Sequence, residues 1–408
     1  MDAPESGKGY VMGSRMRVGV NTIFLNPEGA GGIWTYVYHL MREMPVLDPT
    51  IEYALFTNRE NATAFDTGGV ANVHPVACPI NASHRLARIA YEYNVLPVQA
   101  RWERVNVLFS PSFTTPLRLG YRSVLTIHDV QHEDLLPSTP SLEQTIFRQI
   151  FRRAAQSATH ILTVSEHAKR RIVACYGVSP DHVTVTPESA DPVYFISVSA
   201  DEIARVRNAY GLHAPYILAV GQIHPHKNLG ALIDAFIALR RMHDSTSQLV
   251  LVGAFKGAAV ALQERVRAEG LAGEVILTGW VPNGDLPALY QGAAVYVLPS
   301  RYEGFGVPVL EAMASGTPVI TTTATALPEV AGDAALLVDP DDGAGLVTAL
   351  RRVLDDEALR TELIGRGAAR ARHFSWQETA RGTLAVLQQV GESARGRKLR
   401  SGAVTSAE

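Results

Sequence analysis

Cysteine is nearly absent from this chain, whose 408 residues include only Cys78 and Cys175, neither of them in a CxxC or Cys/His cluster. Two isolated thiols argue against a disulfide framework and a structural zinc site, and they favour a reducing, cytoplasmic setting. No apolar run approaches the ~20 residues that cross a bilayer. The first fifteen residues are polar and glycine-rich, without the apolar region of a secretion signal.

A strong excess of one charge is also absent. The chain has 37 Lys and Arg against 40 Asp and Glu, so its net charge of −3 gives no reason to expect nucleic acid as a partner. Hydrophobic residues, in contrast, make up 47% of the chain, which is ample for large buried cores. At roughly 150 residues per domain, the length suggests two domains.

Short runs that are apolar throughout alternate with helical patterns along most of the chain. Runs of this kind are typical of strands buried on both faces of a parallel sheet, and the alternation predicts two doubly wound, Rossmann-like α/β domains. The expected strands are 17–21, 53–57, 73–78, 107–110, 123–128, 161–164, 183–186, 216–220, 248–252, 275–278, 295–298, 318–322 and 336–338.

A polar, weakly patterned stretch between Pro187 and Pro215 marks the expected domain boundary, because a new strand pattern starts at Tyr216. The resulting division is a disordered leader (1–15), an N-terminal domain (16–195), a C-terminal domain (196–374), a helix that returns to the N-terminal domain (375–391) and a flexible tail (392–408).

The most informative segment, 299–316, follows one of the apolar strands. Pro308 suits the first position of a helix and Gly316 the position just past its end, which would put Glu311 in the first turn. Gly304 and Gly306 let the backbone approach a ligand closely. Free amides at a helix start bind anions, so a diphosphate fits this turn.

Two carboxylates in this segment, Glu303 and Glu311, are good acceptors for sugar hydroxyls. The alternative is that both are surface glutamates beside a glycine-rich turn. The complete strand, loop and helix around them favours the binding site.

Two further strand ends carry candidate residues. After Gly221, His226 and Lys227 could supply charge to phosphate, or Lys227 could be a solvated lysine. His128 and Asp129 end another strand. Asp129 could act as a general base, and His128 could either hydrogen-bond a substrate or make a purely structural bond.

Two weaker signals and one misleading pattern complete the set. Gly31 and Gly32 open a helix, where they either allow a ligand to approach the backbone or simply form a strand-to-helix turn. Trp280-Val281 lines either a base pocket or the core. The acids 339–342 resemble a DxD metal motif, but they follow the last strand and are expected to form a solvated turn.

The Glu303-x7-Glu311 run, together with the segments around Lys227 and His128, resembles the retaining GT-B glycosyltransferases of family 4 (glycosyl transferases group 1, mannosyltransferase-like) from about residue 17 to residue 387. That resemblance implies two Rossmann-like domains facing across a cleft. By this resemblance, Glu303 contacts the donor sugar, Glu311 binds the ribose hydroxyls and His128 lies near the reacting sugar. The remaining implied donor contacts are Gly31, Gly32, Gly221, His226, Lys227, Trp280, Val281 and the turn Gly304, Phe305, Gly306 and Val307.

The sequence departs from this family at three positions. Gln222 and His226 stand where basic residues are usual, and Glu188-Ser189 replaces an Asn-Gly pair. The first two departures weaken the case for a second cation, and the third leaves the role of that loop undefined.

The resemblance implies transfer of a hexose, with retention, from a nucleoside diphosphate sugar to a hydroxyl of a glycan or lipid-linked acceptor in bacterial surface polysaccharide synthesis. GDP-mannose is favoured over UDP and dTDP donors, and neither a metal nor another cofactor is expected. The alternatives are a sugar-nucleotide epimerase on the same fold, a phosphorylase, and an inactive sugar- or nucleotide-binding module.

Basic residues gather in the first half of the chain at Arg85, Arg88, Arg101, Arg104, Arg148, Arg152 and Arg153. The last three lie on an amphipathic helical pattern. This helix either contacts the inner face of a membrane peripherally or packs on the core with a solvated basic face.

Overall fold

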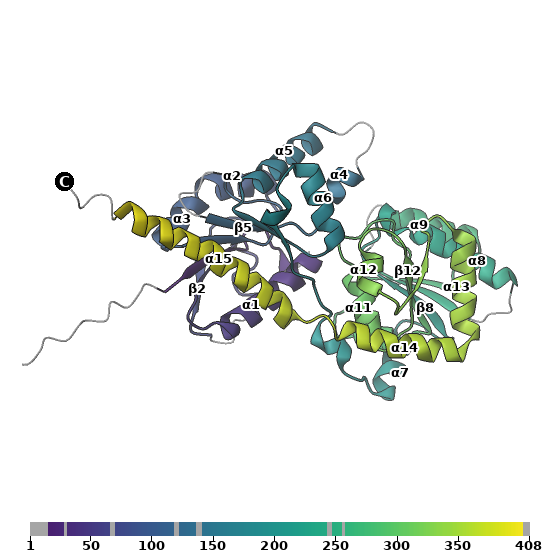
Figure 1. Cartoon of the computed structure of the whole chain (residues 1–408). Helices are drawn as coiled ribbons and strands as arrows, with labels where there is room; N and C mark the ends of the chain where they lie inside the picture. The colour runs from purple at the N-terminus through teal and green to yellow at the C-terminus, as the bar shows by residue number, and fades with distance from the viewer. Residues whose placement is uncertain are drawn as a thin grey trace, which may run out of the picture. The chain divides into compact units, whose positions relative to one another are not determined.

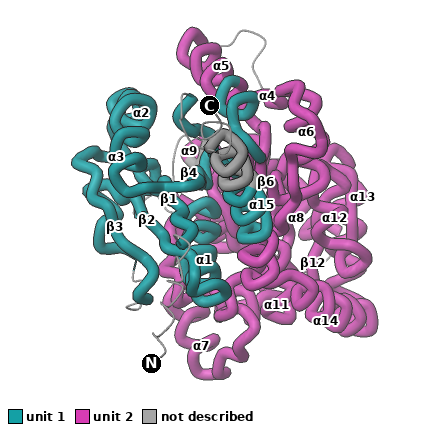
Figure 2. The backbone as a smooth tube through the Cα atoms, turned by 60° about the vertical axis from the view of Figure 1, so that its left-hand side comes forward, with its two compact units in different colours: residues 1–126, 153–160, 383–408 teal, residues 127–152, 161–382 magenta. Residues whose placement is uncertain are grey.

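The computed structural model describes residues 15–27, 31–65, 70–117, 122–135, 141–242, 247–254 and 258–402. Most of the predicted leader and the end of the predicted tail lie outside these residues. The chain forms two compact units, residues 1–126, 153–160 and 383–408 in the first and residues 127–152 and 161–382 in the second (Figure 2).

The described residues form thirteen strands in two parallel sheets (Figure 1). The first sheet has the order β3-β2-β1-β4-β5-β6-β7 and the second the order β10-β9-β8-β11-β12-β13. Their bounds are β1 (Arg17–Asn21), β2 (Glu52–Thr57), β3 (Val73–Ala77), β4 (Val107–Ser110), β5 (Arg122–Thr126), β6 (His160–Thr163), β7 (Val183–Val185), β8 (Tyr216–Val220), β9 (Gln248–Val252), β10 (Val275–Gly279), β11 (Val295–Leu298), β12 (Val319–Thr322) and β13 (Leu336–Val338).

Helices connect the parallel strands. They are α1 (Gly32–Leu47), α2 (Arg85–Asn94), α3 (Leu96–Trp102), α4 (Gln131–Asp134), α5 (Leu142–Ser157), α6 (Glu166–Tyr176), α7 (Ala200–Ala209), α8 (Leu229–Met242), α9 (Ala258–Ala268), α10 (Leu286–Gln291), α11 (Val307–Ala314), α12 (Leu327–Ala331), α13 (Gly343–Asp355), α14 (Glu357–Ala371) and α15 (Trp376–Gly402), with short 3-10 turns η2 (Pro180–His182), η3 (Pro192–Phe195) and η4 (Pro225–Lys227). No helix in the described part of the chain is long and apolar enough to cross a membrane.

The second sheet is buried on both faces, as its continuous apolar strands predicted. Successive side chains of a strand point to opposite faces, and in β8 Leu218 joins one core cluster while Ile217 joins the other. In β9, Val250 and Leu249 divide in the same way. The parallel α/β fold class is therefore confirmed, and each expected strand is present to within two residues at either end.

The strand order places a switch point in the second sheet between β8 and β11, where the chain leaves two neighbouring strands toward opposite sides. Ligands of open α/β sheets bind beyond the carboxyl ends of strands at such a point. The segments that follow Val220 and Leu298 begin there, and these are the segments that carry Lys227 and Glu303.

Candidate functional site

The loop after β8 turns sharply before it reaches α8. Gly221 has a φ of +151° and donates its backbone N–H to Val252 on the neighbouring strand. A side chain at Gly221 would come within 3.9 Å of the Lys227 Cε atom. The glycine thus lies beside the aliphatic part of Lys227, at the edge where the switch point opens.

Lys227 and Glu303 meet across the two loops. The Lys227 Nζ atom donates to Glu303 Oε1 at 2.6 Å, and the Ser300 hydroxyl donates to the same oxygen at 2.6 Å. Both charged side chains are largely buried, with 16% and 11% of their surface exposed. The structure therefore brings together the predicted phosphate cation and the first predicted sugar-binding acid.

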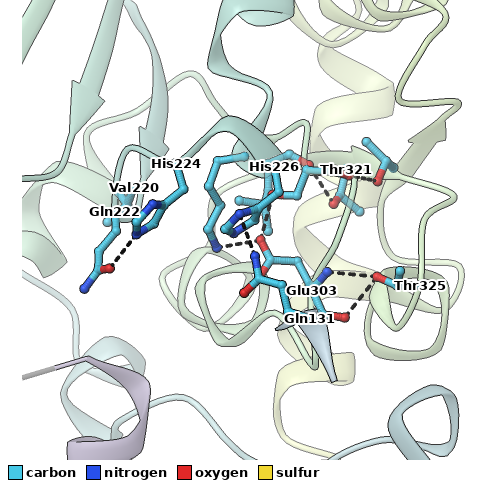
Figure 3. A network of polar contacts seen from close by, with 12 residues as sticks. Gln131, Val220, Gln222, His224, His226, Glu303, Thr321 and Thr325 are labelled. Atoms are coloured by element: carbon cyan, nitrogen blue, oxygen red, sulfur yellow. Dashed lines mark hydrogen bonds and ion pairs between the residues drawn. The ribbon is translucent and has the colours of Figure 1, made fainter. Parts of the chain in front are cut away.

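Threonines at and just beyond the end of β12 hold the backbone of Glu303 and of the nearby Ser300 in place (Figure 3). The Thr325 hydroxyl accepts from the Glu303 amide and donates to its carbonyl, both at 2.9 Å, although Thr325 itself has a φ of +51°. Thr322 donates to the Ser300 carbonyl at 2.6 Å. These residues were not predicted, and the only sequence signal for them is the threonine-rich run 321–325 that follows a strand.

The helix start after Gly306 matches the expected anion-binding geometry. Gly306 has a φ of +110° and precedes α11, and no side chain caps the first amides. The helix begins at Val307, so Pro308 takes its second position. Glu311 is consequently the fifth residue and lies beyond the first turn, which corrects the expectation made above.

Glu311 is partly buried and accepts a hydrogen bond of 2.8 Å from the Tyr290 hydroxyl. Burial raises the pKa of Glu311 to about 7, and this effect outweighs the hydrogen bond from Tyr290, which favours the carboxylate. A carboxyl group with this pKa changes charge near neutral pH.

Gly304 packs directly against the segment that follows β5. A Cβ atom at Gly304 would lie 2.8 Å from the His128 carbonyl oxygen and 2.9 Å from the Asp129 Cβ atom. The Ser165 hydroxyl also donates to the Gly304 carbonyl at 2.7 Å. Within the second unit, the structure therefore gathers His128, Asp129 and the Glu303 turn.

The two strand-end residues have different surroundings. β5 ends at Thr126, earlier than expected, so His128 and Asp129 lie in the following loop. Burial raises the pKa of Asp129, despite the hydrogen bond that its side chain accepts from the Gln131 amide. The His128 Nδ1 atom is 3.2 Å from a carboxylate oxygen of Glu188.

His226 does not supply the missing positive charge. Its Nδ1 atom lies 2.7 Å from the Gln131 side-chain amide nitrogen (Figure 3). An amide nitrogen can only donate, so this Nδ1 accepts and carries no proton. Burial, together with the nearby Lys227, lowers the pKa of His226 to about 4. The suggestion of a proton-dependent charge at this position is therefore wrong at neutral pH.

The remaining predicted residues are distributed as follows. Trp280 follows β10 and is 71% exposed, which rules out the core-packing alternative, whereas Val281 is buried. The Phe305 ring is buried against Phe374, so only its backbone could face a ligand. Gly31 and Gly32 begin α1 in the first unit, and their role as donor contacts remains a prediction.

The acids 339–342 have local roles. Asp342 accepts from the Gly345 amide at the start of α13, Asp339 accepts from the Asp341 amide, and Asp341 forms an ion pair with Arg301. Two of the carboxylates therefore stabilise the turn before α13, and the third pairs with a residue of the loop after β11.

Comparison with known proteins places both halves of the chain in related families. Residues 30–194 match the family described as Glycosyltransferase Family 4, and residues 214–356 match the family described as Glycosyl transferases group 1. Together the two segments include the loops that carry His128, Lys227 and Glu303.

Individual relatives agree with these matches. The chain is 33% identical over 279 residues to O-antigen chain mannosyltransferase B of Escherichia coli, covering 68% of this chain and 73% of that protein. It is 28% identical to O-antigen chain mannosyltransferase RfbU of Salmonella typhimurium, covering 82% and 90%. Sucrose-phosphate synthase from Thermosynechococcus elongatus has the same fold, with a TM-score of 0.75 at 19% identity over 93% of this chain and 100% of that chain. These findings confirm the GT-B fold of two Rossmann-like domains.

The raised pKa of Glu311 predicts a specific pH dependence of stability. The folded protein binds this proton more tightly than the unfolded chain does, so the stabilisation is complete below about pH 4.5 and is lost as the pH rises through about 7. At about 1.4 kcal/mol per pKa unit, the effect is at most about 3–4 kcal/mol. We expect Glu311→Gln to match the wild type near pH 5 and to be the more stable protein near pH 8, in urea unfolding followed by circular dichroism.

Glu264, which is exposed on α9, provides the matched control. The difference in unfolding free energy between Glu264→Gln and the wild type should be the same at both pH values. A constant difference between Glu311→Gln and the wild type across this range would contradict the assignment of the proton to Glu311.

Proposed function

The chain belongs to glycosyltransferase family 4, and on this premise we propose that it transfers a hexose from a nucleoside diphosphate sugar to a hydroxyl of a glycan or lipid-linked acceptor, with retention at the anomeric carbon. The observation that carries the proposal is the contact between Lys227 and Glu303, 2.6 Å apart beside the open start of α11. A cation, uncapped amides and a carboxylate that could accept hydrogen bonds from a sugar thus lie at one switch point, which supports the proposal.

The donor that we propose is GDP-mannose. Support comes from the two relatives named above, both described as O-antigen chain mannosyltransferases, and bacterial surface polysaccharide synthesis is the corresponding process. UDP, dTDP and ADP sugars are the competing donors, and a thermal-shift series with all four separates them.

Lys227 and the amides at the start of α11 would stabilise the negative charge that develops on the leaving diphosphate. This is electrostatic catalysis by groups already in place, and we propose that it requires no metal ion or other cofactor. Glu303 would hold the sugar and Glu311 the ribose, since both carboxylates can accept hydrogen bonds from hydroxyls.

Asp129 would receive the proton of the acceptor hydroxyl. A general base works best with a pKa near the operating pH, and burial moves the pKa of Asp129 in that direction. His128, adjacent in the chain, would contact the reacting sugar.

Two other functions remain as competitors. A sugar-nucleotide epimerase would consume the nucleotide sugar without transferring it, and an inactive binding module would release no nucleotide. The neutral His226 is relevant to the inactive binding module. His226 supplies no second cation, but Lys227 still provides a positive charge in this loop.

Transferase activity is tested by release of GDP from GDP-mannose in the presence of an acceptor extract. We expect acceptor-dependent release that persists in EDTA, and an α-linked product by NMR because the donor is α-linked. Lys227→Met should lower kcat about 100-fold, the usual effect of removing one stabilising donor from a developing charge. Lys169 on α6, which is partly exposed, offers a control, as Lys169→Met should retain full activity.

Release that does not depend on acceptor, or conversion of GDP-mannose to another GDP sugar, would contradict the proposal. Loss of activity in EDTA that Mg²⁺ restores would contradict metal independence alone.

A lipid-linked acceptor would bring the protein to the inner face of a membrane, and we propose that α2 and α3 make this peripheral contact. Leu86 and Trp102 are 75% and 77% exposed, and Val98 is 46% exposed. Arg85 and Arg101 are exposed beside them. The two acidic residues among 83–104 do not oppose this positive charge, because Glu92 is fully buried and Glu103 is paired with Arg17.

The helix α5 is the weaker candidate for membrane contact. Phe147 and Ala154 on its apolar face are buried, Arg148 is paired with Glu133, and Arg152 donates to the Cys175 carbonyl. These contacts favour the alternative of a core-facing helix.

Co-sedimentation with vesicles tests this contact. We expect the wild type to bind vesicles containing phosphatidylglycerol at low salt and Trp102→Glu to bind several-fold more weakly, because a charged side chain replaces an exposed ring at an anionic surface. Met242→Glu, at an equally exposed position on α8, should bind like the wild type. Equal binding by all three proteins would contradict a contact through α2 and α3.

A further inference from the structure

The segment between β7 and η3 carries a buried acid that the reaction described above does not use. Glu188 is 6% exposed, and its Oε1 atom lies 3.2 Å from Nδ1 of His128, which is 9% exposed. This is one of the positions at which the sequence departs from the Asn-Gly pair usual in the family. An amide there could donate or accept, whereas an ionised carboxylate can only accept.

The chain on either side of Glu188 is held by hydrogen bonds, so its backbone has a defined position. The Pro187 carbonyl accepts a hydrogen bond from the Thr379 hydroxyl at 2.5 Å, and the Ser189 hydroxyl donates to the Phe374 carbonyl at 3.0 Å. Two residues further on, the Asp191 side chain accepts from the Val193 amide and begins η3. These bonds fix the point from which the Glu188 side chain extends toward His128.

His128 also lies against the turn that follows Glu303, which is the proposed donor site. Its carbonyl oxygen is the nearest atom to the place that a Cβ of Gly304 would occupy. The charged groups around this histidine are Glu188 on one side and Asp129 next to it in the chain, and Asp129 itself interacts with Glu303 and Lys227. His128 therefore lies where the turn at Gly304 and the segment that carries Glu188 meet, so the orientation of its imidazole matters at this position.

We propose that Glu188 is a positioning residue for the transfer reaction, which holds the proton of neutral His128 on Nδ1 and so places the imidazole lone pair on Nε2. The tautomer of a histidine is fixed by the partner of one ring nitrogen, and the other nitrogen then has the complementary role. His128 consequently presents Nε2 as a hydrogen-bond acceptor to a hydroxyl of the sugar substrate, while Asp129 remains the group that would receive the proton of the acceptor hydroxyl. This inference rests on the proposed function for its kinetic consequence, but not for the tautomer.

Histidine nitrogen NMR tests the tautomer without any substrate. Long-range proton–nitrogen spectra of protein labelled with ¹⁵N-histidine, with His128 assigned by its loss in His128→Gln, should show a protonated Nδ1 and an unprotonated Nε2 at a pH where the ring is neutral. In Glu188→Ala this pattern should shift toward the opposite tautomer or a mixture. A protonated Nε2 in the wild type, or an unchanged pattern in Glu188→Ala, would overturn the proposal.

Kinetics then test the consequence for catalysis. We expect Glu188→Gln to lower kcat about 10–100-fold, the range seen when the partner that orients a functional histidine is removed, with less than a threefold change in KM for the donor. Glu188→Asp should recover part of the activity, and the pH profile of kcat should shift in Glu188→Gln. In the His128→Gln background the same change should have no further effect, and Glu264→Gln serves as the control.

Equal additive losses in the two backgrounds, or a loss confined to KM, would mean that Glu188 acts only on structure or donor binding. If the wild type shows the expected tautomer but no transferase activity, the proposed function fails and the tautomer assignment stands. If the wild type is active and Glu188→Gln is equally active, the inference about Glu188 fails alone.

Discussion

The ion pair between Lys227 and Glu303 joins the two loops on which the candidate site depends. The loops leave β8 and β11, the neighbouring strands at the switch point of the second sheet. A second donor, the Ser300 hydroxyl, reaches the same oxygen of Glu303. Because both charges are largely buried, removing either partner would leave an uncompensated charge, at a cost of about 3–5 kcal/mol for a fully buried pair.

This pairing has a consequence for ligand binding. The positive charge of Lys227 is balanced by Glu303, so the diphosphate that we propose would compete with that acid for the ammonium group. The start of α11 supplies amides that no side chain caps, and these can share the phosphate charge from the other side. The site therefore combines one compensated cation with a helix start, and the lowered pKa of His226 keeps its imidazole uncharged beside them.

The sequence alone predicted the strands of both sheets well, and it singled out Lys227 and Glu303, which the structure places in contact. Buried parallel strands are apolar throughout, so each left a clear signal, and Pro308 and Gly316 bracketed α11 through backbone constraints. The supporting contacts were not predictable, because Thr325, Tyr290 and Gln131 are ordinary residue types whose partners lie far away in the chain. Their roles depend on which strand ends become neighbours, and no local pattern encodes that.

The misjudged features share the same cause. A histidine beside a lysine suggested a second charge, but burial and the Gln131 side chain make His226 neutral. Glu188 was noticed only as a departure from the family, and its position beside His128 gives that departure a chemical meaning. In both cases the surroundings, rather than the residue type, determine what the side chain can do.

The central claim is that the turn after β11 and Lys227 together hold a diphosphate. A crystal structure of the full chain with GDP tests it most directly. The account predicts phosphate oxygens within hydrogen-bond distance of Lys227 Nζ and of the amides from Gly304 to Val307, with the ribose hydroxyls on Glu311. Phosphates bound elsewhere, with the contact between Lys227 and Glu303 unchanged, would contradict it.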